Sequence, residues 1–258
     1  MDRLLIIAVP VLTVIAVLWW ARNRKLGPTP TAVEVPAPRQ LDSLLDTIDS
    51  TPDSPISFGY KMSWLAIKTP DAASVRDSLN IESVKPANWH TGFVAAYNGH
   101  TFISSAVDGW VFVVSQALPE LGHASDEMEW TTLMSGMSRK FGDVQYFATH
   151  RVSGFSAWAR YTNGEELRAF AYCDETLVNR SKKTAGELEL GCNYFDSDSP
   201  DAESESYWER EDLSFPDEEH VMEIAGKWGI NPQNLGQLNL PHGSGWIGNL
   251  VRVSKGAE

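Results

Sequence analysis

Apolar and polar residues alternate in several short runs, which is the pattern of strands that bury one face. Met62, Trp64 and Ala66 form the first of these runs. The other runs that we expect to be strands are residues 92–97, 101–105, 110–116, 144–150, 155–162, 167–173, 187–195 and 250–253. Asn-Gly or Asp-Gly pairs separate several neighbouring runs, and they favour tight hairpins because both residues tolerate positive φ. The pattern therefore predicts antiparallel pairing.

Other segments repeat their apolar residues every three or four positions, which predicts helices. Thr69 suits the N-cap of one helix, with Pro70 at its first helical position. The further helix starts that we expect are at Ser125, at Pro216 and, for a short turn, at Asn231. Gly142 ends the helix that starts at Ser125, because glycine readily adopts the left-handed conformation found there.

Together these elements predict an α+β domain over residues 58–258, with a mainly antiparallel sheet and a few packed helices. Five tryptophans fall at core positions of their elements: Trp64, Trp110, Trp130, Trp158 and Trp228. Trp89, Trp208 and Trp246 lie in loop-like sequence, so these are the tryptophans that we would test for ligand binding.

The N-terminal residues predict a membrane anchor. Residues 4–20 contain no charge, and three basic residues follow directly, whereas a cleaved signal would need small residues there. A spanning helix needs about 17–25 residues, so we expect residues 1–26 to be a transmembrane anchor with a basic flank in the inner (cytoplasmic) membrane. The positive-inside rule favours a cytoplasmic body, and a periplasmic body stays open. Residues 27–57 are Pro-rich and predict a linker.

Charge is distributed unevenly along the chain. Lys and Arg number 21 against 34 Asp and Glu, which gives a formal net charge of −13. Nucleic acid is not an expected partner, because proteins that bind phosphates normally carry the opposite sign. Residues 196–223 carry a net charge of −11, whereas residues 58–195 carry −3. The sequence thus predicts an acidic loop at about residues 196–213 on a nearly neutral body.

The acidic loop combines carboxylates with two aromatic side chains, as a surface that binds a basic protein would. The candidate partner-binding residues are Glu203, Glu205, Tyr207, Trp208, Glu209, Glu211 and Asp212. The alternative interpretation is a solvated insertion that Tyr207 and Trp208 hold against the body.

A second candidate site would combine His90, His100, His150 and Arg151. A histidine and an arginine at a strand end could serve as an acid–base group and an anion clamp. No spacing typical of metal ligands or of an activated nucleophile supports this site. We therefore expect no metal, no cofactor and no assembled set of catalytic residues.

Glycine and cysteine positions give two further interpretations. Residues 243–248 match G-x-G-x-x-G but lack the strand, helix and acidic residue of a dinucleotide site. They predict a glycine-rich turn before the last strand. Cys173 and Cys192 could pair in an oxidising compartment, or remain as buried thiols in a reducing one.

Several runs resemble those of an uncharacterised family of bacterial proteins. They are residues 62–67 (MSWLAI), 108–113 (DGWVFV), 144–152 (VQYFATHRV), 157–160 (AWAR) and 217–222 (DEEHVM). Such proteins occur in settings of polymorphic toxin–immunity systems, so the resemblance implies a bacterial accessory protein and carries over no catalytic residue.

The functional hypothesis that follows is a non-enzymatic, membrane-tethered binding module of the immunity type, which neutralises a toxin through its acidic surface. Two alternatives stay open. One is an enzyme or small-ligand sensor that uses His150 and Arg151, and the other is a structural component of a bacterial envelope assembly.

Overall fold

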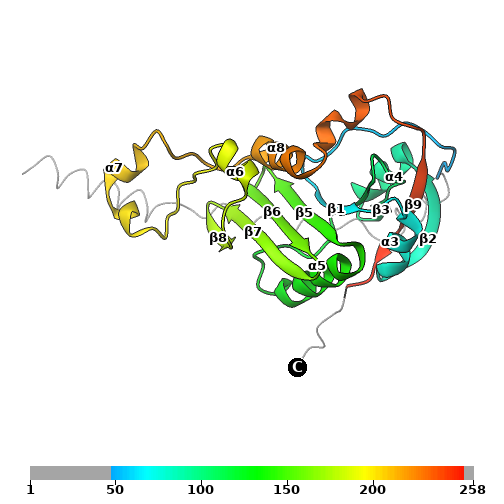
Figure 1. The fold of residues 1–258 in the computed structure, drawn as a ribbon, viewed down its shortest axis with the longest axis horizontal. Helices are drawn as coiled ribbons and strands as arrows, with labels where there is room; N and C mark the ends of the chain where they lie inside the picture. Colours follow the sequence, from blue (N-terminus) through cyan, green and yellow to red (C-terminus); the bar gives the residue numbers. More distant parts are fainter. Residues whose placement is uncertain (1–47, 253–258) are drawn as a thin grey trace, which may run out of the picture. The chain divides into compact units, whose positions relative to one another are not determined.

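The computed structural model describes residues 48–252, in which nine strands form one antiparallel sheet (Figure 1). The strand order is β2-β9-β3-β4-β1-β5-β6-β7-β8. The strands are β1 (Ser63–Lys68), β2 (Ile81–Asn88), β3 (Thr101–Ile103), β4 (Trp110–Ser115), β5 (Asp143–His150), β6 (Phe155–Thr162), β7 (Glu165–Cys173), β8 (Glu175–Arg180) and β9 (Ser244–Leu250). The predicted α+β class with an antiparallel sheet is confirmed.

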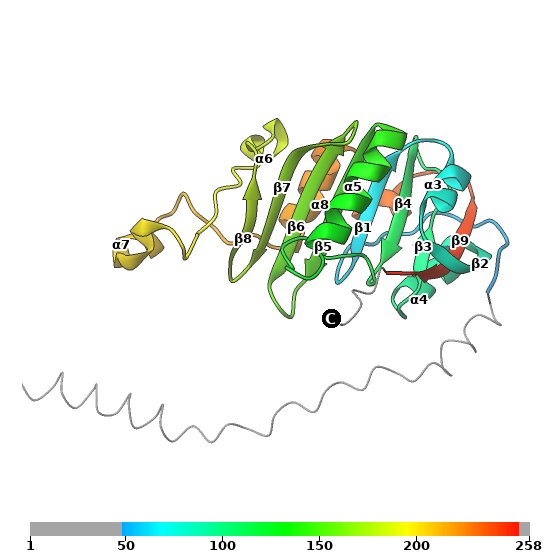
Figure 2. The ribbon, with the colours of Figure 1, turned by 90° about the horizontal axis from the view of Figure 1, so that it is seen from below.

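Helices cover both faces of the sheet (Figure 2). The α-helices are α3 (Ala72–Ser78), α4 (Trp89–Ala96), α5 (Glu127–Phe141), α6 (Ala185–Glu189), α7 (Glu205–Trp208) and α8 (Glu218–Trp228). Two 3₁₀ turns, η1 (Pro200–Glu203) and η2 (Pro232–Gln237), complete the set among the described residues. Helices α3 and α5 pack on one face, and α4 and α8 pack on the other.

Each face of the sheet has its own hydrophobic core, because strand side chains alternate between the faces. In β1, Trp64 and Ala66 join the core under α4 and α8, whereas Leu65 and Ile67 join the core under α3 and α5. A central strand is therefore apolar on both sides. The five tryptophans predicted to be core residues are all buried, at 8% exposure or less.

Local signals in the sequence define several elements correctly. Strand β6 covers the expected residues, and Asn163 and Gly164 join it to β7 with φ values of 53° and 91°. Helix α5 ends at Gly142, whose φ is 88°. The first helix begins two residues later than expected, since Asp71 rather than Thr69 caps α3 by accepting a hydrogen bond from the Ser74 N–H at 2.9 Å.

Residues 92–97 were predicted as a strand, and this is wrong because residues 92–96 belong to helix α4 and Tyr97 is its C-cap. Asn88 starts the helix, since its side-chain oxygen accepts a hydrogen bond from the Thr91 N–H at 3.0 Å. Trp89 is consequently buried in the first helical turn instead of lying in a loop. A Cβ at Gly92 would lie 2.1 Å from the Phe102 ring, so glycine permits this close packing of α4 on β3.

Two further strand predictions need correction. Residues 187–195 do not form a strand, because a capping box between Thr184 and Glu187 starts helix α6 there. Residues 243–248 are not a turn, and most of them belong to strand β9, which ends at Leu250 where the last strand was expected to begin. A Cβ at Gly245 would lie 1.9 Å from the Ile103 carbonyl oxygen, so the glycine pattern serves close strand packing.

The sequence analysis did not predict either edge strand, β2 or β8. Residues 82–86 of β2 are exposed, and β8 alternates between exposed and half-buried positions. Strands at the edge of a sheet face solvent and often carry charged side chains, so they contain few apolar residues. Their polar composition made them look like loops.

The predicted anchor, residues 4–20, and most of the predicted linker lie outside the described residues. A search of the described part of the chain finds no helix with the length and apolar character needed to span a membrane. The described end of the linker packs on the body: Ile48 and Ile56 contact the core, and Asp53 accepts hydrogen bonds from the N–H groups of Trp89 and His90.

Candidate binding surface

The acidic loop, residues 196–213, is folded into an arm that stands clear of the sheet beyond β8 (Figures 1 and 2). Its short helical elements are η1 and α7. Backbone hydrogen bonds close its base, from the Phe195 N–H to the Ser214 carbonyl (3.0 Å) and from the Ser214 N–H to the Asn193 carbonyl (2.9 Å). We call residues 196–213 the acidic arm.

Aromatic packing holds the acidic arm together. Phe195 is buried between Trp208, whose ring stacks on it at 5.4 Å, and Phe215 at 4.9 Å. Tyr207 is only 6% exposed, and its hydroxyl accepts a hydrogen bond from the Asp196 N–H (2.7 Å) and donates one to the Asp196 carbonyl (3.2 Å). Tyr207 therefore fixes the arm from inside and presents little surface to a partner.

Two aromatic side chains remain accessible on the arm and at its base. Trp208 is 44% exposed although its indole N–H donates to the Ala202 carbonyl at 2.9 Å, and Phe215 is 55% exposed. Sequence reasoning missed Phe215, because a single aromatic residue before a helix start carries no periodic signal. Its position beside an acidic block was the available clue.

The carboxylates of the arm point to solvent. Glu203, Glu205, Glu209, Glu211 and Asp212 are all exposed. Eight acidic residues and one arginine give residues 196–213 a net charge of −7. The arginine, Arg210, binds Asp212 at 2.5 Å, and this hydrogen bond lowers the pKa of Asp212. The other predicted partner-binding carboxylates make no ion pair within the described residues.

A cavity of about 410 Å³ lies at the base of the arm, between the β5–β6 turn and the start of α8. Its charged residues are Arg151, Asp217, Glu218 and Glu219. Arg151 binds one carboxylate oxygen of Glu218 at 2.8 Å. The other oxygen, Oε1, is buried and has no hydrogen-bond partner among the described residues. This arm-base pocket thus carries three carboxylates and one guanidinium.

The second predicted site is spread over several elements. His90 is exposed in the first turn of α4, His100 is buried before β3 with its Nδ1 2.7 Å from Asn249 Oδ1, and His150 is exposed at the end of β5 with its Nδ1 3.0 Å from Ser153 Oγ. Within the described residues, no hydrogen bond or ion pair joins these histidines to one another or to Arg151. Arg151 lies in the arm-base pocket instead.

The described residues also include potential metal ligands and both cysteines. No group of three or more His, Cys, Asp or Glu side chains among them could hold a metal ion. Cys173 and Cys192 are both free. Burial raises the pKa of each thiol, which makes the reactive thiolate less abundant at neutral pH.

Comparison with family models, with curated proteins and with solved structures gives no match in any of the three. The resemblance of residues 62–67 and the other quoted runs to a bacterial family therefore stays a prediction.

Proposed function

We propose that this protein is a non-enzymatic, membrane-tethered binding module of the immunity type, which captures a basic protein such as a toxin through the acidic arm. The observation that carries the proposal is the structure of the acidic arm. Its carboxylates are exposed, and the rings of Trp208 and, at its base, Phe215 remain accessible while they pack on Phe195. Hot spots of protein interfaces are enriched in aromatic side chains, and a polar rim surrounds them.

The arrangement of charge supports a basic partner. A net charge of −7 on residues 196–213 would steer a positive surface toward the arm. The arm-base pocket would add to this attraction and favour a lysine or arginine side chain, because its three carboxylates outnumber its one guanidinium. The tether itself depends on residues 4–20, which lie outside the described residues.

Affinity capture with the full chain tests the proposal. The arm variant E203Q/E205Q/E211Q removes three exposed carboxylates, and the matched control E82Q/E165Q/E175Q removes three exposed carboxylates from the sheet strands. Both variants have the same net charge. Immobilised wild-type and variant proteins are mixed with lysate of the native host at low and at high salt, and captured proteins are identified by mass spectrometry.

We expect the wild-type protein and the sheet control to capture a basic protein at low salt, and the arm variant to lose it. Capture should fall at 1 M salt, where the screening length shrinks to about 3 Å. If all three proteins capture the same partners, or if capture does not depend on salt, the acidic arm is not the binding surface.

A further inference from the structure

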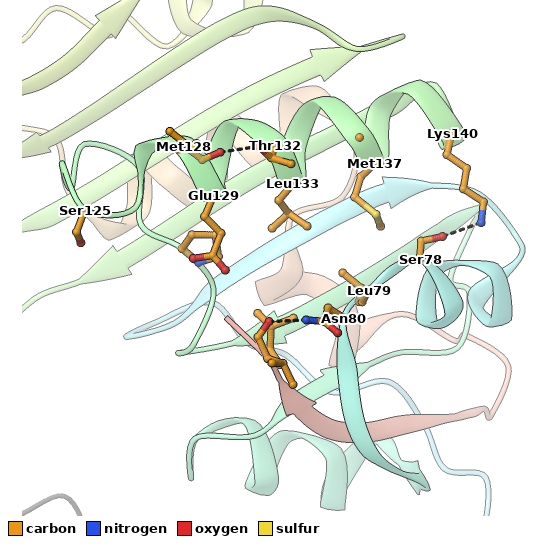
Figure 3. A pocket seen from close by; sticks show the side chains of 14 residues that line it. Ser78, Leu79, Asn80, Ser125, Met128, Glu129, Thr132, Leu133, Met137 and Lys140 are labelled. Carbon is orange, nitrogen blue, oxygen red and sulfur yellow. Dashed lines mark hydrogen bonds between the residues drawn. The ribbon is translucent and has the colours of Figure 1, made fainter. Parts of the chain in front are cut away.

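Two places among the described residues combine exposed apolar side chains with charge. One is the pocket along α5, where Met128 is 75% exposed and the Lys140 ammonium donates to the Ser78 hydroxyl at 2.7 Å (Figure 3). The chain itself thus supplies a polar partner for that cation. The other place is Trp208 on the acidic arm, the only exposed tryptophan among the described residues. Its ring lies in a region of negative charge.

The indole ring of Trp208 is held with one face inward. It stacks on Phe195, with 5.4 Å between the ring centroids and an interplanar angle of 21°. Its N–H donates to the Ala202 carbonyl at 2.9 Å, which fixes the direction of the ring edge. A side chain fixed in this way loses little conformational entropy when a ligand binds to it.

The outer face of the Trp208 ring is open. The other ring in contact with it is Tyr207, whose centroid lies 5.1 Å from Trp208 and 5.6 Å from Phe195. Because Trp208 and Phe195 are 5.4 Å apart, the three centroids form a nearly equilateral triangle. Tyr207 therefore lies beside the stacked pair, since a ring on the outer face of Trp208 would be much farther from Phe195. The 44% exposure of Trp208 thus belongs to its outer face and outer edge.

Exposed carboxylates flank Trp208 in the chain. Glu205 lies three positions before it in α7, and Glu209 follows it directly. The only arginine of residues 196–213, Arg210, already donates to both carboxylate oxygens of Asp212, at 2.9 and 2.5 Å. A cation that approaches the outer face would therefore meet an aromatic ring and carboxylates together.

Other tryptophans of this chain show what such a ring attracts. Three of them have a cation 4.7–5.8 Å from the ring centroid: Trp110 with Lys68, Trp130 with Arg180 and Trp246 with Arg76. The shortest of these distances belongs to Trp246, which is also the most accessible of the three. Trp208 is not among them in the described part of the chain, although tryptophan is the aromatic side chain that attracts cations most strongly. A partner would supply the missing cation.

Arginine fits this combination of groups better than lysine. A guanidinium is planar, weakly hydrated and able to stack on an aromatic face, and its N–H groups bind carboxylates in pairs. The ring of Trp208, with Glu205 and Glu209 near it in the chain, offers both kinds of contact. An ammonium is strongly hydrated and acts as a point charge.

We propose that an arginine side chain of the basic partner stacks on the outer face of Trp208, and that its guanidinium binds neighbouring carboxylates of the acidic arm. This inference rests on the proposed function, because it names the side chain by which the arm recognises its partner. Arginine and tryptophan are both enriched among the residues that dominate the affinity of protein interfaces.

The test uses three peptides of equal length: hexa-arginine, hexalysine and hexacitrulline, in which a neutral urea replaces each guanidinium. Calorimetry measures their affinity for the full chain in a non-ionic detergent. Wild type should bind hexa-arginine most tightly and hexacitrulline least. W208L should lower the affinity for hexa-arginine about 5- to 30-fold and that for hexalysine by less than about threefold. W208F keeps a ring on Phe195 and should give an intermediate loss.

Two further measurements separate the ring from the charge of the arm. The arm variant E203Q/E205Q/E211Q should weaken binding of both hexa-arginine and hexalysine, and the sheet control should weaken neither. Labelling with 5-fluorotryptophan gives a fluorine signal for Trp208, identified by its absence from W208F. This signal should shift with hexa-arginine and not with hexacitrulline, which decides the question even if W208L does not fold.

Several results would overturn the proposal. They are binding of hexa-arginine by W208L as tight as by wild type, binding of hexacitrulline as tight as that of hexa-arginine, and an unshifted Trp208 signal. Equal losses of hexa-arginine and hexalysine in W208L would overturn the choice of arginine. The proposed function fails on a different result, namely capture from lysate that does not depend on the carboxylates of the arm.

Discussion

The buried ion pair between Arg168 and Glu187 provides the sharpest test of how this fold is held together. Both side chains are only 1% exposed, and the Arg168 Nε lies 2.8 Å from Glu187 Oε1. The carboxylate also accepts hydrogen bonds from the Trp158 indole N–H (3.0 Å) and from the backbone and hydroxyl of Thr184 (2.7 and 3.0 Å). The pair thereby fastens α6 to β6 and β7.

Replacing either partner leaves a buried charge without its counter-charge. E187Q keeps the size of the side chain but leaves the Arg168 cation uncompensated, and R168M leaves the Glu187 anion. Each should lower the free energy of unfolding by about 3–5 kcal/mol. The matched control is E189Q on the same helix, which removes the exposed Lys227–Glu189 pair (2.6 Å) and should leave the urea midpoint unchanged.

Urea unfolding followed by circular dichroism measures these effects. The double variant R168M/E187Q removes both charges, so its cost should be less than the sum of the single costs by about 2 kcal/mol or more. Additive costs, or single variants as stable as E189Q, would refute the reasoning, because the two charges would then not depend on each other.

Two further predictions concern contacts that the C-terminal part of the described chain makes. Burial alone would raise the pKa of Asp126, but hydrogen bonds from Arg252, the Glu120 N–H and Ser125 outweigh it and lower the pKa to about 2. Asp126 should therefore contribute about 2 kcal/mol to the free energy of unfolding. This contribution is fully present above pH 4 and is lost as the pH falls through 2. D126N should flatten this part of the stability–pH curve, and an unchanged curve would contradict the assignment. G245A should destabilise β9 strongly, because its Cβ would collide with the Ile103 carbonyl. The control is G136A in the interior of α5, where a Cβ would meet no atom within 4 Å, and it should be neutral or stabilising in thermal unfolding.

Short-range signals in the sequence determined many of the elements correctly. Asn163-Gly164 predicts a tight hairpin because both residues take positive φ there, and Gly142 ends α5 for the same reason. These signals act between residues a few positions apart, so they can be read without the fold. The acidic block at residues 196–213 is likewise a property of the sequence alone.

Contacts between distant residues decided the rest. The apolar run at 92–97 is compatible with a strand or a helix. In the structure most of it is helical, and Gly92 of this helix packs against the ring of Phe102 in β3. Gly245 belongs to a strand because β3 runs directly beside it, a neighbour that lies more than a hundred residues away in the sequence.

The same limit applies to the candidate sites. Tyr207 and Trp208 are adjacent in the sequence, yet Tyr207 is buried and Trp208 is exposed. Tyr207 packs against the Phe195 ring and its hydroxyl bonds to the Asp196 backbone, which leaves little of it in contact with solvent. The sequence determined that a charged and aromatic segment exists. Only the tertiary structure decided which of its rings reach solvent, since exposure depends on what packs against each side chain.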